Sequence, residues 1–363
     1  MNTYHICFSS DNNYAQHLGV TIASILTTNP KHNFHFYVLD GGISEKNKNK
    51  LFLLKKIKQF ELDFIPMDEN EFSGCPVPPN SHFSLAMFYR FKILSLFPNL
   101  EKILYLDCDL LVLNDLKPLF DIKLDKSWMA LSADYFSDKL SVELKIKDRP
   151  YYNSGVIMFN LKECRKNSLE KKLFQYAISH PDLRYGDQDV INMVVGAHIL
   201  TLPQSFNCQF QPFVCDLENR ILSKIKEITI LHYTSGLKPW KANSQHQLND
   251  YYFKFLKHTP WKGEYNKIML KKMKRFLFQK IKTEKTKKIK IFSITVIKKI
   301  RKKDYSKKIL FLGIPVWKSG PDKWRLKYEQ LLQEEYLFHS DITALQKQLE
   351  ALEGIKLLKK AKK

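Results

Sequence analysis

The first 110 residues alternate between two hydrophobic periodicities. Short apolar runs predict strands at His5–Phe8, Phe34–Leu39, Phe60–Ile65 and Lys102–Leu106. Apolar residues three and four positions apart predict helices at Tyr14–Thr28, Ser44–Ile57 and Ser84–Leu96. Strands and helices that alternate with short connections predict an α/β fold with a parallel, right-handed βαβ sheet. In such sheets, ligands bind beyond the carboxyl ends of the strands.

The pattern continues less regularly to about residue 260. Strands are predicted at Trp128–Ser132, Gly155–Phe159 and Glu227–Leu231, and helices at Leu169–Ile178 and Gln188–Val195. Lys271–Lys308 is rich in lysine interleaved with Ile, Phe and Leu. From Tyr328 onward, apolar residues fall on heptad positions, which is typical either of a short coiled coil or of a helix packed on its own domain.

The positive charge is concentrated in one segment. The net charge is +22, but residues 1–260 hold 30 basic and 27 acidic side chains, whereas residues 261–310 hold 19 and 3. A basic segment of this kind is typical of proteins that bind an anionic membrane or nucleic acid. The alternative is a lysine-rich linker that is simply solvated. We favour a membrane surface over nucleic acid, because the first 260 residues are nearly neutral.

Cysteine spacing and hydropathy predict a cytoplasmic protein. Six cysteines occur without a Cys-x-x-Cys pair, which indicates free thiols in a reducing compartment. No run of about 18 apolar residues is present, so we expect no membrane-spanning helix. Together with the basic segment, this predicts a protein held peripherally on the inner face of the cell membrane.

Two aspartates follow the predicted strand Lys102–Leu106. Asp107 and Asp109 are one residue apart, so both carboxylates can reach one divalent cation, and a diphosphate can supply further oxygens. A second Asp-x-Asp, Asp187-Gln188-Asp189, opens a predicted helix instead. The position at the end of a buried strand favours the first pair as the metal site.

His232 and Lys238 follow the last predicted strand of the first 260 residues. A histidine at a strand end can complete a metal site with two aspartates, although an isolated histidine is more often structural. An imidazole ligand favours Mn²⁺ over Mg²⁺. If His232 binds the metal, Lys238 lies within reach of a phosphate; otherwise it is a surface charge.

Other polar residues stand at predicted strand ends or in apolar surroundings. The loop Ser9–Tyr14 can contact a base and ribose, with Tyr14 available for stacking, or can simply cap the first helix. Arg90 lies in an otherwise apolar helix, so we expect it to pair with a carboxylate or a diphosphate. Gly155 permits close backbone approach, and Asn160 is typical of a turn.

Five motifs in order resemble glycosyltransferase family 8. They are SSDNNYA, YLDCDLLV, YYNSGVIMFNL, YGDQDVIN and HYTSGLKPW, within residues 1–260. The sequence is similar to bacterial lipopolysaccharide galactosyl- and glucosyltransferases, and more distantly to glycogenin. The resemblance implies a GT-A fold, a UDP-sugar donor, Mn²⁺ and retention of anomeric configuration.

Matched by motif, the resemblance also implies roles for individual residues. The metal ligands would be Asp107, Asp109 and His232. Donor contacts would come from Ser9, Asp11, Asn13, Tyr14, Arg90, Asn153, Ser154 and Lys238. Sugar contacts near the reaction centre would come from Asp134, Asp187 and Gln188. Two departures occur: Cys108 between the aspartates, and Thr234-Ser235-Gly236 where relatives often have an earlier glycine.

The predicted organisation has three parts. Residues 1–260 form a GT-A (Rossmann-like) domain, residues 261–310 a basic membrane-surface segment, and residues 311–363 a helical tail through which the chain could form a homo-oligomer. The predicted reaction is retaining transfer of galactose or glucose from UDP-galactose or UDP-glucose to a saccharide or glycolipid acceptor, such as lipopolysaccharide or lipooligosaccharide core. The alternatives are a metal-dependent UDP-sugar phosphohydrolase and a basic nucleic-acid-binding protein.

Overall fold

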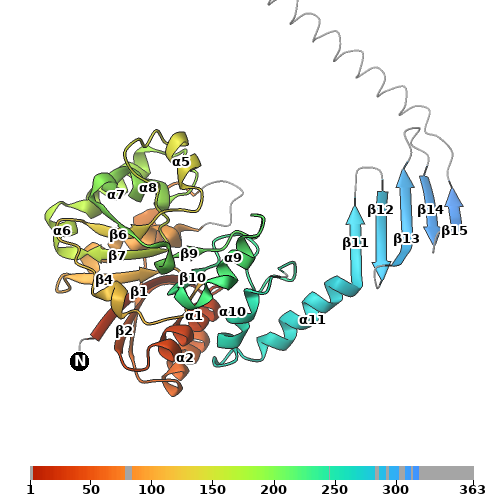
Figure 1. The fold of residues 1–363 in the computed structure, drawn as a ribbon, viewed down its shortest axis with the longest axis horizontal. Coiled ribbons are helices and arrows are strands. Elements are labelled where there is room, and N and C mark those ends of the chain that lie inside the picture. Colours follow the sequence, from red (N-terminus) through yellow and green to blue (C-terminus); the bar gives the residue numbers. More distant parts are fainter. Residues whose placement is uncertain are drawn as a thin grey trace, which may run out of the picture. The chain divides into compact units, whose positions relative to one another are not determined.

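The computed structural model describes residues 3–77, 84–244, 246–282, 286–291, 294–301, 307–311 and 314–318, with side chains up to Met273. The chain divides into two compact units, one reaching Leu270 and one beginning at Lys271. Figure 1 shows the elements of both units. The sequence placed the boundary at residue 260, ten residues earlier than the structure does.

A seven-stranded sheet forms the centre of the first unit, in the order β3-β2-β1-β4-β7-β6-β8. Its strands are β1 (Thr3–Asp11), β2 (Asn33–Gly41), β3 (Glu61–Pro66), β4 (Lys102–Leu106), β6 (Met129–Ser132), β7 (Val156–Asn160) and β8 (Ile199–Leu202). The first four strands along the chain are parallel, which confirms the predicted βαβ arrangement. Strand β7 runs antiparallel to both β4 and β6, so the sheet as a whole is mixed.

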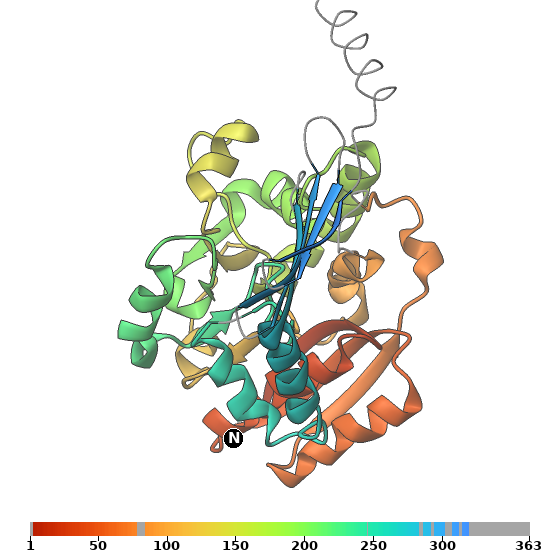
Figure 2. The ribbon, with the colours of Figure 1, turned by 90° about the vertical axis from the view of Figure 1, so that its right-hand side faces the viewer.

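Helices cover both faces of this sheet. Helices α1 (Ala15–Thr28) and α2 (Glu45–Phe52) lie on the opposite side from α7 (Leu169–Ser179) and α8 (Asp187–Val195) in both views (Figures 1 and 2). A strand that is buried on both faces contributes alternate residues to two cores. In β4, Leu104 and Leu106 belong to one hydrophobic cluster, and Ile103 and Tyr105 belong to the other.

Helix α1 fixes the segment that follows β4. It is buried along most of its length, and two of its hydroxyl groups bond this segment. Thr21 donates to the carbonyl groups of Cys108 and Leu110, and Ser24 accepts from the amide of Val112. These bonds satisfy buried backbone groups of residues 108, 110 and 112, because buried backbone groups must be paired.

A small second sheet joins distant segments. Strand β5 (Leu110–Val112) pairs antiparallel with β10 (Ile230–His232), and β10 pairs parallel with β9 (Cys208–Gln209). In this register His232 is the partner of Leu110, the residue after Asp109. Shorter helices complete the unit: the 3₁₀ segment Leu85–Lys92, α3 (Ile93–Leu96), α4 (Lys117–Phe120), α5 (Ser137–Glu143), α6 (Leu161–Lys166), α9 (Leu217–Ser223) and α10 (Asn249–Leu256). Asn160 caps α6 by accepting from the amide of Glu163.

Residues beyond 260 still belong to the core of the first unit. Trp261 and Ile268 are both buried there. A Cβ atom on Gly19 of α1 would lie 2.5 Å from the ring of Trp261, so this glycine makes room for the indole. The basic character of the sequence begins near residue 261, but the packing of the first unit continues to Leu270.

Where the second unit is described, up to residue 318, it consists mostly of strands, whereas a helical extension was predicted. Helix α11 (Glu264–Leu277) spans the boundary, and an antiparallel sheet follows it in the order β11-β12-β13-β14-β15. These strands are Phe278–Lys282, Thr286–Ile291, Ile294–Arg301, Lys307–Phe311 and Ile314–Lys318. In TKKIKI, Ile289 and Ile291 alternate with lysine, a period of two that favours a strand, whereas in VIKKI the isoleucines are three residues apart. The predicted coiled coil from Tyr328 lies outside the described residues.

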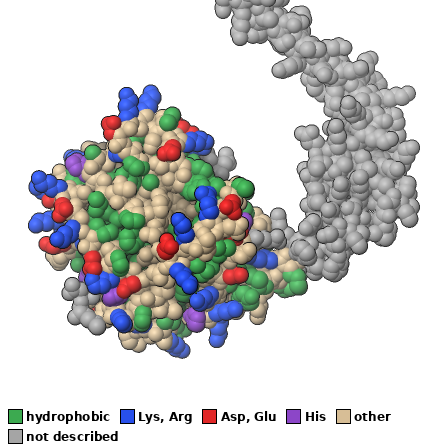
Figure 3. All heavy atoms as spheres, viewed as in Figure 1, with side chains coloured by type: hydrophobic (Ala, Val, Ile, Leu, Met, Phe, Trp, Pro, Cys, Tyr) green, Lys and Arg blue, Asp and Glu red, His purple; other side chains and the backbone are tan. Residues whose placement is uncertain are grey.

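Acidic and basic side chains are interspersed on the face of the first unit that Figure 3 shows, in agreement with its small net charge. Within the described residues, no helix combines the length and the apolar character needed to cross a bilayer.

Candidate functional site

Asp107 and Asp109 lie where β4 ends and the second sheet begins. The amide of Asp107 donates to the carbonyl of Gly155 at 2.9 Å, which extends the pairing of β4 with β7. Asp109 directly precedes β5. Between them, the thiol of Cys108 is buried and donates to the carbonyl of Ser9 at 3.2 Å. The cysteine side chain therefore points away from the carboxylates, as strand alternation predicts.

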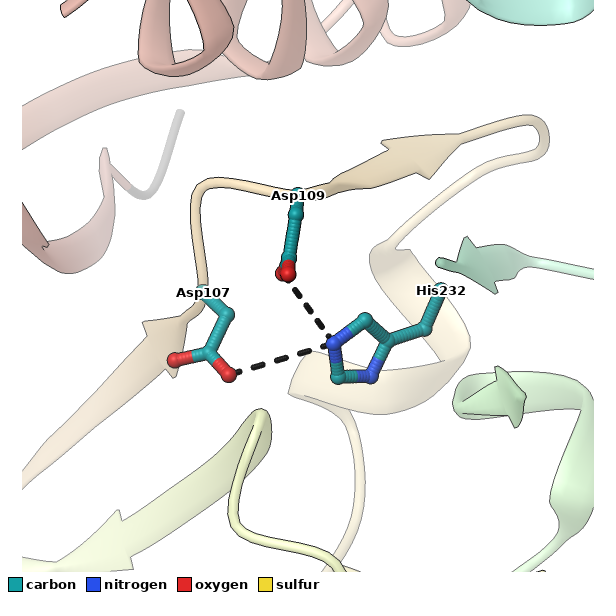
Figure 4. A group of neighbouring side chains, drawn as sticks. All are labelled: Asp107, Asp109 and His232. Carbon is teal, nitrogen blue, oxygen red and sulfur yellow. Dashed lines mark hydrogen bonds and ion pairs between the residues drawn. The ribbon is translucent and has the colours of Figure 1, made fainter. Parts of the chain in front are cut away.

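His232 joins these two aspartates. Its Nε2 atom lies 3.1 Å from Oδ1 of Asp109 and 3.8 Å from Oδ2 of Asp107. Figure 4 shows the three side chains converging from β10 and from the segment after β4. One ligand atom from each residue lies within 4.8 Å of the others. The structure thus brings together the three residues that the sequence proposed as metal ligands.

Gly155 provides space for this cluster. A Cβ atom at this position would lie 2.2 Å from Cε1 of His232 and 2.8 Å from Oδ2 of Asp107. Two carboxylates and an imidazole suit a divalent cation such as Mn²⁺. The donor set fits a bound cation, and the missing side chain at residue 155 leaves room for the imidazole that completes this set.

Lys238 adds a positive charge beside Asp109. Its ammonium group is buried and donates to Oδ2 of Asp109 at 2.5 Å and to the carbonyl of Tyr233. Burial alone would raise the pKa of Asp109, but Lys238 and His232 lower it well below its usual value. Asp109 is therefore ionised, as a metal ligand must be.

Arg90 is buried between two carboxylates, which confirms the prediction that it pairs with an acid. It lies 2.9 Å from Oδ1 of Asp107 and 3.2 Å from Oδ2 of Asp187. It also donates to the carbonyl of Ser154. Burial raises the pKa of Asp187 to about 6, although Arg90 opposes this rise. Arg90 thus joins Asp107 to the loop before β7, through Ser154, and to the start of α8, through Asp187.

A second group of polar side chains is built around Gln188. Its Oε1 atom accepts from Nδ2 of Asn153 at 3.0 Å and from the amide of Ser154 at 3.1 Å. Asp134 receives bonds from Asn153 at 3.2 Å and from Nε2 of Gln188 at 3.4 Å. The structure therefore brings together the residues proposed to contact the donor sugar.

The two aspartates of the second Asp-x-Asp motif have different roles. Asp187 faces Arg90, whereas Asp189 is a structural acceptor at the start of α8. Asp189 accepts from the hydroxyl of Tyr151 and from the amides of Arg184 and Tyr185. A carboxylate engaged in this way is not available to a metal, which supports the choice of the first motif.

The loop after β1 contacts an aromatic group through Tyr14. Asp11 accepts from the amide of Tyr14 at 2.9 Å and from the side chain of exposed Asn13 at 3.3 Å. The ring of Tyr14 packs edge-on against Trp240, with centroids 6.2 Å apart. Burial and the charge of Asp109 raise the pKa of Tyr14. Ser9 adjoins the site through its contact with Cys108.

Sequence reasoning missed two residues of this site. The hydroxyl of Tyr105 donates to Oδ1 of Asp107 at 3.1 Å, and its ring stacks with Arg90, whose Cζ lies 4.2 Å from the ring centroid. The side-chain oxygen of Asn207 lies 2.9 Å from Nδ1 of His232, the ring nitrogen that does not face the aspartates. A polar-tipped Tyr inside the strand KILYL was an available signal for the first. Asn207 lies in an irregular segment whose pattern gives no signal.

Comparison with known proteins places these features in a family. A model described as Glycosyl transferase family 8 matches residues 5–244. The chain is 29% identical over 271 residues to General stress protein A of Bacillus subtilis, covering 71% of this chain and 94% of that protein. It is 26% identical to the lipopolysaccharide 1,2-glucosyltransferase of Escherichia coli K12, covering 72% and 79%. The crystal structure of galactosyltransferase LgtC with donor and acceptor sugar analogs superimposes with a TM-score of 0.62 at 26% identity, covering 72% of this chain and 99% of LgtC.

Proposed function

Because the chain belongs to glycosyltransferase family 8, we propose that it transfers galactose or glucose from a UDP-sugar to a saccharide acceptor with retention of configuration. The observation that carries this proposal is the convergence of Asp107, Asp109 and His232 beside Lys238. The proteins it resembles include a glucosyltransferase and a galactosyltransferase, which supports a hexose donor. The lipopolysaccharide-modifying relative supports a lipopolysaccharide or lipooligosaccharide core as the acceptor.

The proposed donor site follows from the charges of the cluster. A divalent cation held by Asp107, Asp109 and His232, with Mn²⁺ preferred over Mg²⁺, would neutralise the diphosphate of the donor. Lys238 has three ammonium protons, of which Asp109 and Tyr233 take two. The third can stabilise the negative charge that grows on the departing phosphate. The loop Ser9–Tyr14 would bind the uridine.

The sugar would lie against the group built around Gln188. Asp134, Asp187 and Asn153 can orient its hydroxyl groups by hydrogen bonds. A double displacement requires a nucleophile, and the carboxamide of Gln188 is a poor one. We therefore propose that the acceptor hydroxyl attacks from the same face as the departing UDP, with a phosphate oxygen taking its proton.

A donor panel tests this function. The full chain is incubated with UDP-galactose, UDP-glucose and UDP-N-acetylglucosamine, with Mn²⁺ or EDTA, and released UDP is measured with and without truncated core oligosaccharide. We expect Mn²⁺-dependent release from one of the two hexose donors, stimulated by acceptor, and a product with the anomeric configuration of the donor by NMR. Formation of UMP and sugar 1-phosphate that no acceptor stimulates would favour a phosphohydrolase, and an inverted product would contradict retention.

We further propose that the basic second unit holds the enzyme on an anionic membrane surface, where a glycolipid acceptor resides. Its backbone register places Ile289, Ile297 and Phe311 in one row across β12, β13 and β14. The neighbouring row contains Lys288 and Lys298. A segment that combines rows of apolar and of cationic residues has the composition that binds anionic lipid.

Truncation after Leu270 tests membrane binding. We expect the shortened protein to lose cosedimentation with phosphatidylglycerol vesicles and to keep Mn²⁺-dependent UDP-sugar hydrolysis. The cut must follow Leu270, because Trp261 and Ile268 belong to the core of the first unit. Unchanged vesicle binding after truncation would contradict the proposal, and salt-sensitive retention of DNA by the full chain would point to nucleic acid instead.

A further inference from the structure

Asn207 is a buried amide that lies between two groups of the site. It follows the 3₁₀ segment Gln204–Phe206, precedes β9, and is 0% exposed. Its Oδ1 atom lies 2.9 Å from Nδ1 of His232, and its Nδ2 atom lies 2.9 Å from Oδ1 of Asn153. The side-chain oxygen of Asn207 therefore contacts the cluster of Asp107 and Asp109 through His232, and its nitrogen contacts the group around Gln188 through Asn153.

The direction of each hydrogen bond between His232, Asn207 and Asn153 is determined by neighbouring groups that can only donate or only accept. A backbone amide can only donate, and the amide of Gly155 donates to Oδ1 of Asn153 at 3.0 Å. An ionised carboxylate can only accept, and Asp134 lies 3.2 Å from Nδ2 of Asn153. Gly155 and Asp134 together therefore orient the amide of Asn153, with its oxygen toward Asn207.

The orientation of Asn153 sets that of Asn207, which in turn sets the tautomer of His232. Because Oδ1 of Asn153 accepts, Asn207 must present its NH₂ group there, and its oxygen then faces His232. An amide oxygen only accepts, so Nδ1 of the imidazole must carry a proton. In the neutral ring, Nε2 is then left with its lone pair, and Nε2 is the atom that faces Asp107 and Asp109.

We propose that Asn207 is a positioning residue, which holds His232 in the tautomer that can ligate a cation through Nε2 and links this ligand to the sugar-contacting Asn153. This inference rests on the metal site of the proposed function. Groups that hold the second nitrogen of a ligating histidine fix its ring and its tautomer, and their loss lowers metal affinity about 10- to 100-fold. Asn207 is not itself a metal ligand, because its oxygen faces the opposite side of the ring.

Direct measurement of Mn²⁺ binding separates this role from a merely structural one. We compare the full chain with the Asn207→Leu and Asn207→Asp variants by electron paramagnetic resonance of free Mn²⁺, without turnover. Leucine has a similar branched shape but no acceptor, so we expect the dissociation constant to rise about 10- to 100-fold. Aspartate retains an acceptor for the Nδ1 proton, so we expect affinity equal to or tighter than that of the unmodified protein.

Asn29→Leu is the matched control. Asn29 is also a buried asparagine that bonds backbone groups, accepting from the amide of Leu116 and donating to the carbonyl of Asn114, but it belongs to no part of the site. We expect it to lower stability and to leave Mn²⁺ affinity unchanged. An Asn207→Leu affinity equal to that of the unmodified chain overturns the inference, as does an Asn207→Asp variant as weak as Asn207→Leu. If the unmodified chain binds no Mn²⁺, the proposed function fails as well.

Nitrogen NMR gives a readout that needs no variant of Asn207. In ¹⁵N-histidine-labelled protein at about pH 8.5, above the ordinary pKa of histidine, long-range correlations distinguish the two neutral tautomers. The His232 signals are assigned by their absence in a His232→Gln variant. We expect the proton on Nδ1. A neutral His232 with its proton on Nε2 overturns the inference, even if Asn207→Leu does not fold.

Discussion

The imidazole of His232 packs so closely on Gly155 that a Cβ atom on residue 155 would lie 2.2 Å from Cε1. Nonbonded contacts of a Cβ atom below 3.0 Å essentially never occur, so one of the two residues must move if a side chain is added. The backbone of Gly155 is fixed by the bond from Asp107 and by β7. The imidazole is therefore the group that moves.

Gly155→Ala should displace His232 and abolish the proposed Mn²⁺ binding. We expect at least a 100-fold loss of sugar transfer with native far-ultraviolet circular dichroism, because the change is local. Gly263→Ala is the control, since a Cβ atom there meets no other atom within 4 Å. Retention of normal Mn²⁺ affinity by Gly155→Ala would show that the ring does not need its present position.

Arg90→Met should destabilise the fold strongly. It leaves the carboxylates of Asp107 and Asp187 without their buried partner, and breaking a buried ion pair costs about 3–5 kcal/mol. Urea unfolding measures the loss. Arg90→Met combined with Asp187→Asn should recover part of it, because one uncompensated charge is removed. A loss below about 1 kcal/mol would mean that water or another group reaches these carboxylates.

His17 should make the fold sensitive to mild acid. Its ring is buried, stacks on Trp240 at 3.5 Å, and bonds the hydroxyl of Tyr252 at 2.7 Å. Burial lowers the pKa of His17 to about 3. The folded state therefore excludes a proton that the unfolded chain binds below about pH 6.5. Stability is present above that pH and falls as pH decreases toward 3, by up to about 1.4 kcal/mol per pH unit.

The comparison for this prediction is His17→Gln. The pH dependence of its unfolding free energy should lack this slope between pH 6.5 and 5, whatever the absolute stability of the variant. Parallel profiles for the two proteins would mean that His17 accepts a proton in the folded state.

Asp187 should change the pH dependence of stability in the opposite direction to His17. Burial raises its pKa to about 6, so the folded state binds a proton more readily than the unfolded chain does. The contribution of this group to stability is present below about pH 4 and is lost as pH rises through 6. Asp187→Asn should remove that loss, seen as a change in the slope of unfolding free energy between pH 4 and 6. An unchanged slope would place the folded-state pKa near its ordinary value.

Much of the site was predictable because its residues stand at strand ends or in conspicuous surroundings. Asp107 and Asp109 directly follow a buried strand, and parallel strands direct such residues to one edge. Arg90 was conspicuous because a charged residue among Met, Phe and Leu requires a buried partner. The predicted strands and helices of the first unit agree with the structure to within a few residues at most of their ends.

What could not be predicted depends on contacts between distant segments. Asn207 bonds residues 25 and 54 positions away, and nothing in its neighbours indicates this. The reversal of β7 is also not visible in its apolar sequence, because burial on both faces hides the strand direction. In the second unit, Lys and Ile alternate in TKKIKI, but the isoleucines of VIKKI are three residues apart, so this pattern does not distinguish strands from helices.

The reversed direction of β7 has a consequence for where the chain can vary in length. In the parallel strands, the segment that leaves the strand reaches the ligand edge, whereas in β7 it is the segment that enters, Asn153 to Gly155. The chain leaves β7 at Asn160, the partner of Lys102 at the start of β4, on the far edge of the sheet. Extra residues inserted after α6 should therefore be tolerated, whereas a single residue inserted just before β7 would shift Gly155 away from His232.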